Sequence, residues 1–173
     1  MNFGEAIKSV FSKYATFSGR ARRSEFWYFV LFNFLVSFVL GLIPFLSWVA
    51  GLWALAVLIP SLAVAVRRFH DIGKSGWTYL YFLVPGLLYV GYMFYFIFKH
   101  AYSYIQAGSD LDADFISELL TQNSSSLAII GILMLVSLIA SIIFIVWMAR
   151  DSQPGENKWG PNPKEIQSQG NAW

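Results

Sequence analysis

The chain has 173 residues, of which 57% are hydrophobic and 13% are charged, and its formal net charge is +2 at pH 7. A soluble domain normally carries about a quarter charged residues, so this composition is typical of a membrane protein. The sequence contains no cysteine, which excludes disulfides, thiolate metal sites and cysteine nucleophiles.

The first residues predict a short amphipathic helix. Asn2 and Glu5 have the spacing of a helix N-cap and its third residue, which can each bond to the other's backbone. Such a helix either lies in the headgroup region of a membrane or packs on the protein's own surface, and the sequence leaves both open. The apolar side chains that recur on one face are Phe3, Ile7, Val10, Phe11 and Tyr14.

Long uncharged runs predict the membrane spans. Phe26 to Val66 is a run of 41 residues without Asp, Glu, Lys, Arg or His, and about 20 apolar residues cross a bilayer core of roughly 30 Å. This run therefore holds two spans, separated by a bend at Gly41 and residues 43–45. Two further uncharged runs, of 22 and 23 residues, each hold one span. We predict an all-α integral membrane four-helix bundle, a single membrane domain over residues 1–173, with spans at about 26–43, 46–66, 77–98 and 127–149, a loop at 99–126 and a tail at 150–173.

Within the loop after the third predicted span, the acidic stretch 110–114 resembles the start of a calcium-binding loop. An EF-hand requires glycine at the sixth position and glutamate at the twelfth, where this chain has Phe115 and Thr121. We therefore expect no calcium site. The four-residue spacing of Leu111, Phe115 and Leu119 instead predicts a short amphipathic helix.

Basic residues gather on one side of the predicted membrane. Four spans place both termini and the loop between the second and third spans on the same side, and eleven of the twelve Lys and Arg residues fall there. Only Lys99 falls on the other side. The positive-inside rule therefore predicts that both termini and the tail are cytoplasmic.

Three segments on the predicted cytoplasmic side carry unusual patterns: residues 17–28 (FSGRARRSEFWY), 67–77 (RRFHDIGKSGW) and 155–163 (GENKWGPNP). In this order they resemble the bacterial inner-membrane family called domain of unknown function 805. The resemblance implies a small four-span protein of the bacterial inner (plasma) membrane, with a periplasmic loop at 99–126, and it implies no biochemical activity. Phe69, where the family often has leucine, and the length of that loop depart from the family pattern.

Local spacing predicts how these segments fold. Ser18 is a suitable N-cap for a helix that runs into the first span. Arg22 and Glu25 are three residues apart, as are Asp71 and Lys74, so each pair can form an ion pair within a helix.

The tail is predicted to be ordered. Residues 155–163 place Trp159 among turn-forming residues, a composition that is rare in a flexible linker. We therefore expect this segment to fold back and dock near residues 68–77.

Arginines near the predicted membrane boundary suggest a binding site for anions. A guanidinium group presents a planar fork that binds two phosphate oxygens, and a basic residue near an anionic leaflet contributes about 1 kcal/mol to binding. The alternative is that these charges only set the topology. The candidate lipid- or anion-binding residues are Arg20, Arg22, Arg23, Arg67, Arg68, His70, Lys74 and Asn157.

Three classes of function remain open. The favoured one is a structural or interaction protein whose Arg-rich cytoplasmic face binds anionic lipid head groups or a partner, because no span carries the charged residues that mark transport paths. A small transporter or channel is the alternative. A membrane enzyme acting on a lipid-linked substrate is the third, with Glu25, His70 and Asp71 as its only credible actors.

We expect no catalytic residues, no metal and no cofactor. His70 and Asp71 are neighbours in sequence and do not face each other on a helix, and the other histidine, His100, falls on the far side of the membrane. A catalytic triad or a histidine metal site is therefore disfavoured. The expected partners are membrane lipids, anionic ones above all, with a second copy of the chain or another membrane protein as further candidates, and no nucleic acid.

Overall fold

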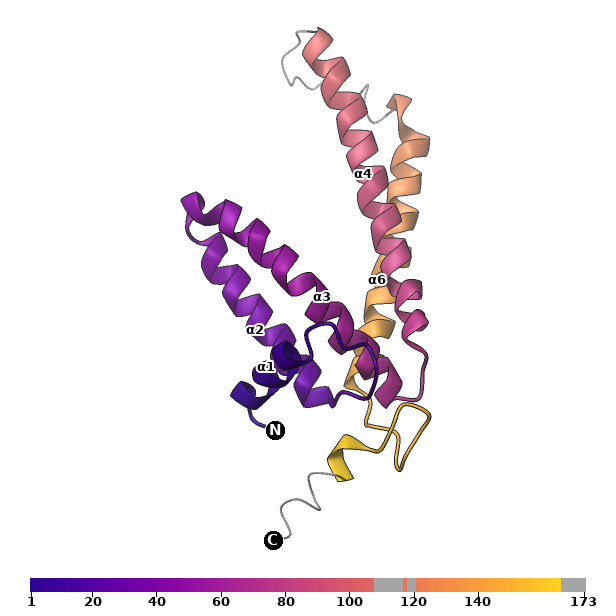
Figure 1. The fold of residues 1–173 in the computed structure, drawn as a ribbon. Helices are drawn as coiled ribbons and strands as arrows, with labels where there is room; N and C mark the ends of the chain where they lie inside the picture. Colours follow the sequence, from indigo (N-terminus) through magenta and orange to yellow (C-terminus); the bar gives the residue numbers. More distant parts are fainter. Residues whose placement is uncertain (108–116, 118–120, 166–173) are drawn as a thin grey trace. The chain divides into compact units, whose positions relative to one another are not determined.

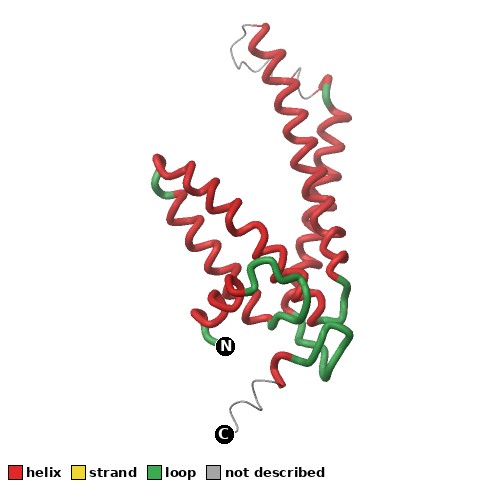
Figure 2. The backbone as a smooth tube through the Cα atoms, in the orientation of Figure 1, coloured by secondary structure: helices red, strands yellow, loops and turns green. Residues whose placement is uncertain are grey.

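The computed structural model describes residues 1–107, 117 and 121–165, and the chain divides into two compact units (Figure 1). Unit 1 comprises Met1–Tyr79 and Ile145–Trp173, and unit 2 comprises Leu80–Phe144. Over the described ranges the secondary structure is helical, apart from turns and one isolated bridge between Asn157 and Gly160 (Figure 2). The acidic stretch 110–114 and the helix predicted around Phe115 lie outside the described residues.

Among the described residues, four helices are long and apolar enough to cross a membrane, namely Arg23–Gly41, Trp48–Asp71, Gly76–Tyr102 and Ser124–Ala149. This confirms the prediction of an all-α protein with four spans. In chain order the elements of unit 1 are α1 (Phe3–Ser12), α2 (Arg23–Gly41), η1 (Pro44–Leu46), α3 (Ser47–Asp71) and η2 (Gly76–Tyr79). Unit 2 contains α4 (Leu80–Ala107) and most of α6 (Ser124–Ala149), whose last turn belongs to unit 1.

Helix α1 packs against the start of α2 (Figure 1). The predicted capping box is present, because the Glu5 N–H donates to Asn2 Oδ1 at 2.8 Å and the Asn2 N–H donates to Glu5 Oε2 at 2.9 Å. Val10 is fully buried, and the ring of Phe11 meets that of Phe29 edge to face at 5.7 Å between centroids. Of the two placements that the sequence left open, the structure therefore shows α1 packed on the protein itself.

Helices α2 and α3 form an antiparallel pair joined at η1, where the bend was predicted. Within the pair, Asn33 Nδ2 donates to Ser61 Oγ at 3.4 Å, and the rings of Phe32 and Trp53 meet edge to face at 5.8 Å. Hydrogen bonds between polar side chains stabilise helix contacts in lipid, where apolar contact alone gives no preference for protein over lipid tails. Asn33 therefore contributes a polar contact between the two helices.

A proline in α3 is compensated by the N-terminal segment. Pro60 is buried inside the helix and has no N–H, so the carbonyl of Ala56, four residues earlier, loses its helical donor. The hydroxyl of Tyr14 donates a hydrogen bond to that carbonyl. Because an unpaired carbonyl in apolar surroundings is costly, this contact joins the segment after α1 to the middle of a span.

Helix α3 continues beyond the predicted end of the second span and stops at Asp71. Its end is a glycine-stopped turn, in which the Gly73 N–H donates to the His70 carbonyl at 3.1 Å and the Lys74 N–H donates to the Phe69 carbonyl at 2.8 Å. Gly73 has φ 79°, a left-handed conformation that residues with a side chain rarely adopt. The extension places residues 67–71, the first part of the segment RRFHDIGKSGW, on the last turn of the helix.

Candidate functional site

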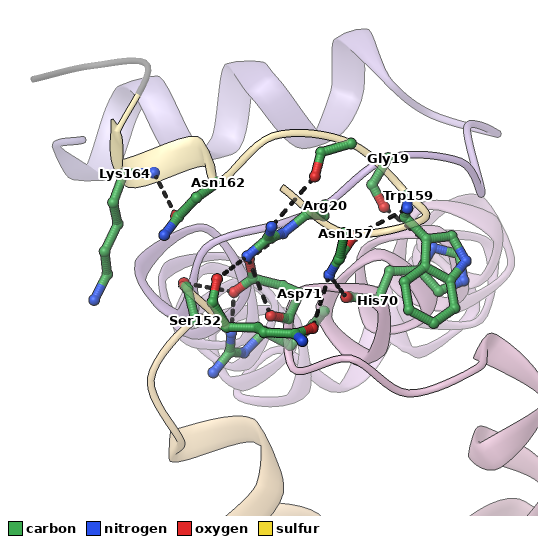
Figure 3. A network of polar contacts seen from close by, with 12 residues as sticks. Gly19, Arg20, His70, Asp71, Ser152, Asn157, Trp159, Asn162 and Lys164 are labelled. Carbon is green, nitrogen blue, oxygen red and sulfur yellow. Dashed lines mark hydrogen bonds and ion pairs between the residues drawn. The ribbon is translucent and has the colours of Figure 1, made fainter. Parts of the chain in front are cut away.

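Five charged side chains are buried near the end of α3, close to the start of α2, the end of α6 and the tail. We call this set the arginine hub. Figure 3 shows two of them, Arg20 and Asp71, with their contacts to the tail. Burying charges is unfavourable unless they are paired and hydrogen-bonded, so their partners determine what the site can do. The members of the hub are Arg20, Glu25, Arg67, Arg68 and Asp71.

Asp71 is the centre of one half of the hub, and its side chain has no exposed surface. Its Oδ1 accepts from Arg20 Nε at 3.0 Å, and its Oδ2 accepts from Arg68 Nη1 and from Ser152 Oγ, the latter at 2.6 Å. Charge-assisted hydrogen bonds of this kind are about twice as strong as neutral ones. The carboxylate thereby joins the segment before α2, the end of α3 and the tail.

Arg20 uses both terminal nitrogens of its guanidinium group to hold the tail. Its Nη1 donates to the carbonyls of Gly155 at 2.8 Å and Gly160 at 3.3 Å. Its Nη2 donates to the carbonyls of Gln153 at 2.5 Å and Asp71 at 3.4 Å. With the bond from Nε to the Asp71 carboxylate, five acceptors surround the five N–H groups that a guanidinium possesses.

Arg68 caps the end of α6. Its Nε donates to the Met148 carbonyl at 3.1 Å and its Nη2 donates to the Arg150 carbonyl, while Trp27 Nε1 donates to the Met148 carbonyl at 3.3 Å. The last carbonyls of a helix lack helical donors, and a cation placed there is favoured by the helix dipole. Arg68 therefore couples the end of α6 to the end of α3.

Arg67 and Glu25 form the other half of the hub. Arg67 Nη1 donates to Glu25 Oε1 at 2.9 Å, and Ser9 of α1 donates to the same oxygen at 3.2 Å. The side chains of Arg67 and Glu25 are 1% and 4% exposed. The remaining Arg67 nitrogens, Nε and Nη2, are buried and have no hydrogen-bond partner among the residues that the structure describes.

The tail docks on the last turn of α3, as its composition predicted (Figure 3). Asn157 Nδ2 donates to the His70 carbonyl at 3.0 Å, and the Trp159 ring stacks on the His70 ring at 4.5 Å with an angle of 10° between the planes. His70 Nδ1 lies 3.1 Å from the carbonyl of Gly19 and must carry a proton to bond with it, because a carbonyl only accepts. His70 is thus bonded to a loop carbonyl and covered by an aromatic ring.

The other predicted binding residues lie outside the hub. Arg23 is exposed and forms an ion pair with Asp151 at 3.6 Å, and the Nζ of Lys74 lies 4.3 Å from the centre of the Trp147 ring. A hydrogen bond from Lys164, together with the charge of Arg23, holds the pKa of Asp151 below its ordinary value. The structure therefore brings Arg20, Arg68, His70 and Asn157 together and gives Arg23 and Lys74 separate partners.

Two local predictions are wrong. Arg22 occupies the N-cap position of α2, which begins at Arg23, so Ser18 does not cap it. The physical reason is that the chain just before the helix is held against the end of α3, because the buried Ala21 donates its N–H to the carbonyl of Arg67 at 3.0 Å.

The two ion pairs predicted from spacing are also replaced. Glu25 pairs with Arg67, and Asp71 pairs with Arg20 as well as with its neighbour Arg68. The pair of Arg68 and Asp71 has the i,i+3 spacing of one helix. The pairs of Glu25 with Arg67 and of Asp71 with Arg20 join different segments, which spacing within one helix does not predict. Sequence reasoning also missed the bond from Ser152 to Asp71. A single serine near the end of a span does not by itself predict a partner.

We expect Trp159→Ala to release the tail. Loss of the stack on His70 removes about 1 kcal/mol beyond the lost burial, so the open tail should be at least roughly fivefold more populated. Limited proteolysis of the protein in detergent should show correspondingly faster cleavage in residues 153–163. Trp159→Phe keeps an aromatic stack and is the matched control. Equal cleavage of wild type and Trp159→Ala would show that the ring does not hold the tail.

Comparison with known proteins gives a family but no activity. The family described as protein of unknown function (DUF805) matches residues 14–115. The inner membrane protein YhaI of Escherichia coli K12 is 39% identical over 95 residues, which are 52% of this chain and 78% of YhaI. The inner membrane protein YhaH of the same strain is 37% identical over 99 residues, which are 52% of this chain and 79% of YhaH. No solved structure matches the chain significantly.

Proposed function

Because the chain belongs to the DUF805 family, whose function is unknown, we propose its role from its own site: a structural or interaction protein of the inner membrane whose basic face binds anionic lipid head groups. Both termini would then lie in the cytoplasm, as the distribution of basic residues favours. A second copy of the chain or another membrane protein is a further partner that such a face could bind.

The observation that carries this proposal is that the arginine hub is built to hold the chain together. The residues best suited to acid–base chemistry are all engaged: Glu25 by Arg67, Asp71 by two arginines, and His70 by a carbonyl and a stacked indole. A general acid or base must come within hydrogen-bond reach of its substrate. Side chains that are buried and paired in this way support a scaffold function rather than catalysis.

The cations left outside the hub supply the proposed lipid contact. They are exposed side chains of unit 1, and each contributes about 1 kcal/mol to attraction toward an anionic surface within a Debye length. The folded tail, held by Arg20, carries three of them next to the end of α6. The exposed basic residues of unit 1 are Lys8, Lys13, Arg23, Arg150, Lys158 and Lys164.

The test measures which lipid surrounds the purified protein. Wild type is reconstituted in phosphatidylcholine bilayers that contain brominated phosphatidylglycerol, whose bromines quench nearby tryptophans. We expect stronger quenching than with brominated phosphatidylcholine, and we expect salt to weaken the preference. Replacing Arg150, Lys158 and Lys164 by Gln should remove most of it.

The matched control keeps the charges and changes the side chains. In that variant Arg150 becomes Lys, and Lys158 and Lys164 become Arg, so quenching should stay at the wild-type level. If the Gln variant also matches wild type, the exposed cations do not select anionic lipid and the proposed function is wrong.

A further inference from the structure

One side of the Arg67 guanidinium, formed by Nε and Nη2, has no hydrogen-bond partner among the described residues. The Nε and Nη2 hydrogens of a guanidinium point the same way, and this side is the fork that binds two oxygens of a carboxylate or phosphate. In Arg20 the corresponding edge is filled by Asp71 and Gln153. In Arg67 it is buried and without a partner among the described residues, while Nη1 alone bonds to Glu25. Leaving buried donors unpaired costs about 1–3 kcal/mol each, and more for charged groups.

The buried charges of the hub as a whole do not balance. Three buried arginines face two buried carboxylates, so one positive charge within the hub has no buried counter-charge. Asp71 already binds both Arg20 and Arg68, and these two arginines also bond to carbonyls. The excess positive charge therefore lies around Asp71, whereas Arg67 has Glu25 as its counter-charge. A water molecule could bond to the fork of Arg67, but a monoanion there would also neutralise the hub as a whole.

We propose that the Nε–Nη2 edge of Arg67 binds a phosphate group, either the phosphodiester of a lipid head group or inorganic phosphate. The inference rests on the proposed binding of anionic head groups and assigns one specific site to it. A phosphodiester carries two equivalent oxygens, which match the planar fork, and a single negative charge, which would balance the hub as a whole. Basic pockets between helices at the membrane boundary hold phosphate head groups in the same way.

The surroundings of the fork determine how such a ligand behaves. Glu25 occupies the opposite side of the guanidinium at Nη1, and Ser9 fixes that carboxylate from α1. Both unpartnered nitrogens are covered by protein, so a phosphate can reach them only when neighbouring side chains move apart. Once bound it would exchange slowly, so it should stay with the protein through purification, unlike lipids that only surround the helices.

The test compares wild type with Arg67→Lys, which keeps the charge but removes the fork. Both proteins are purified in mild detergent and analysed by native mass spectrometry. Wild type should retain one phosphate-bearing molecule per chain under conditions that strip loosely bound lipid, and Arg67→Lys should lose it. Lys99→Arg makes the reverse exchange at an exposed basic residue of unit 2, outside the proposed lipid contact, and should retain it. Equal retention by wild type and Arg67→Lys would show that the fork of Arg67 does not bind phosphate.

A second variant keeps the proposal testable if Arg67→Lys does not fold. Glu25→Gln still offers Arg67 an oxygen, but it removes the carboxylate charge beside the phosphate. More detergent should then be needed to strip the bound molecule than in wild type. An unchanged or lower requirement contradicts the proposal.

The source of the phosphate is settled with stripped wild-type protein. A rise in melting temperature with added phosphatidylglycerol alone assigns the site to a lipid head group, and a rise with inorganic phosphate assigns it to the free ion. A rise with neither overturns the site. Failure here is distinct from failure of the proposed function, because the quenching test depends on exposed cations and does not involve Arg67.

Discussion

Asp71→Asn is expected to lower the free energy of unfolding by about 3–5 kcal/mol, the range observed when one partner of a buried ion pair is removed. The carboxylate lies between Arg20 and Arg68 and also accepts from Ser152. Asparagine has the same shape but removes the negative charge, and its NH₂ group would face an N–H donor. Two buried cations would then share no counter-charge. Unfolding of the purified protein by SDS titration, followed by circular dichroism, measures the change.

Asp151→Asn provides the comparison, because this carboxylate is exposed and pairs with Lys164 and Arg23. Exposed ion pairs contribute about 0–1 kcal/mol, so this variant should stay close to wild type. If Asp71→Asn unfolds at the same SDS fraction as Asp151→Asn, the hub does not stabilise the fold.

The second large effect is expected for Arg20→Lys, which keeps the positive charge but removes the planar guanidinium group. An ammonium group has three donors at one point and cannot reach the carbonyls of Gln153, Gly155 and Gly160 together with Asp71. At least two part-buried carbonyls of the tail lose their donor, at about 1–2 kcal/mol each. We expect a loss of roughly 2–4 kcal/mol, with rapid proteolysis of the tail.

The control for this substitution is Arg23→Lys, because Arg23 makes a single exposed ion pair. Its melting temperature and tail cleavage should match wild type. If Arg20→Lys behaves the same way, charge alone holds the tail, and the fork of Arg20 is dispensable.

The spans could be predicted from sequence because a bilayer acts on each segment separately. A run of uncharged residues such as Phe26 to Val66 becomes helical in lipid whatever its neighbours do, since only a helix pairs its own backbone groups there. The capping box of Asn2 and Glu5 is equally local. These features need no knowledge of which segments meet.

The hub could be predicted only as a set of residues, because its pairings join distant parts of the chain. Arg20 and Asp71 are 51 positions apart, and Arg20 reaches carbonyls more than 130 positions further along. Spacing therefore suggested neighbours in sequence as partners. The docking of Trp159 could be predicted because an aromatic residue among turn residues is unusual. The binding of tail carbonyls by Arg20 could not be predicted, because every residue has a backbone carbonyl.

The pairing of Arg20 with the tail also fixes an order of assembly. A chain is made from its N-terminus, so Arg20 and Asp71 leave the ribosome long before residues 153–160 exist. Throughout that interval Arg20 lacks the three tail carbonyls that it binds in the finished fold. The hub can close only after α6 has been inserted and the tail has returned to it. The hub can therefore close only in a chain whose four spans have all been synthesised. In a chain that ends before residue 153, Arg20 would lack its tail partners and stay exposed, although it is buried in the finished protein.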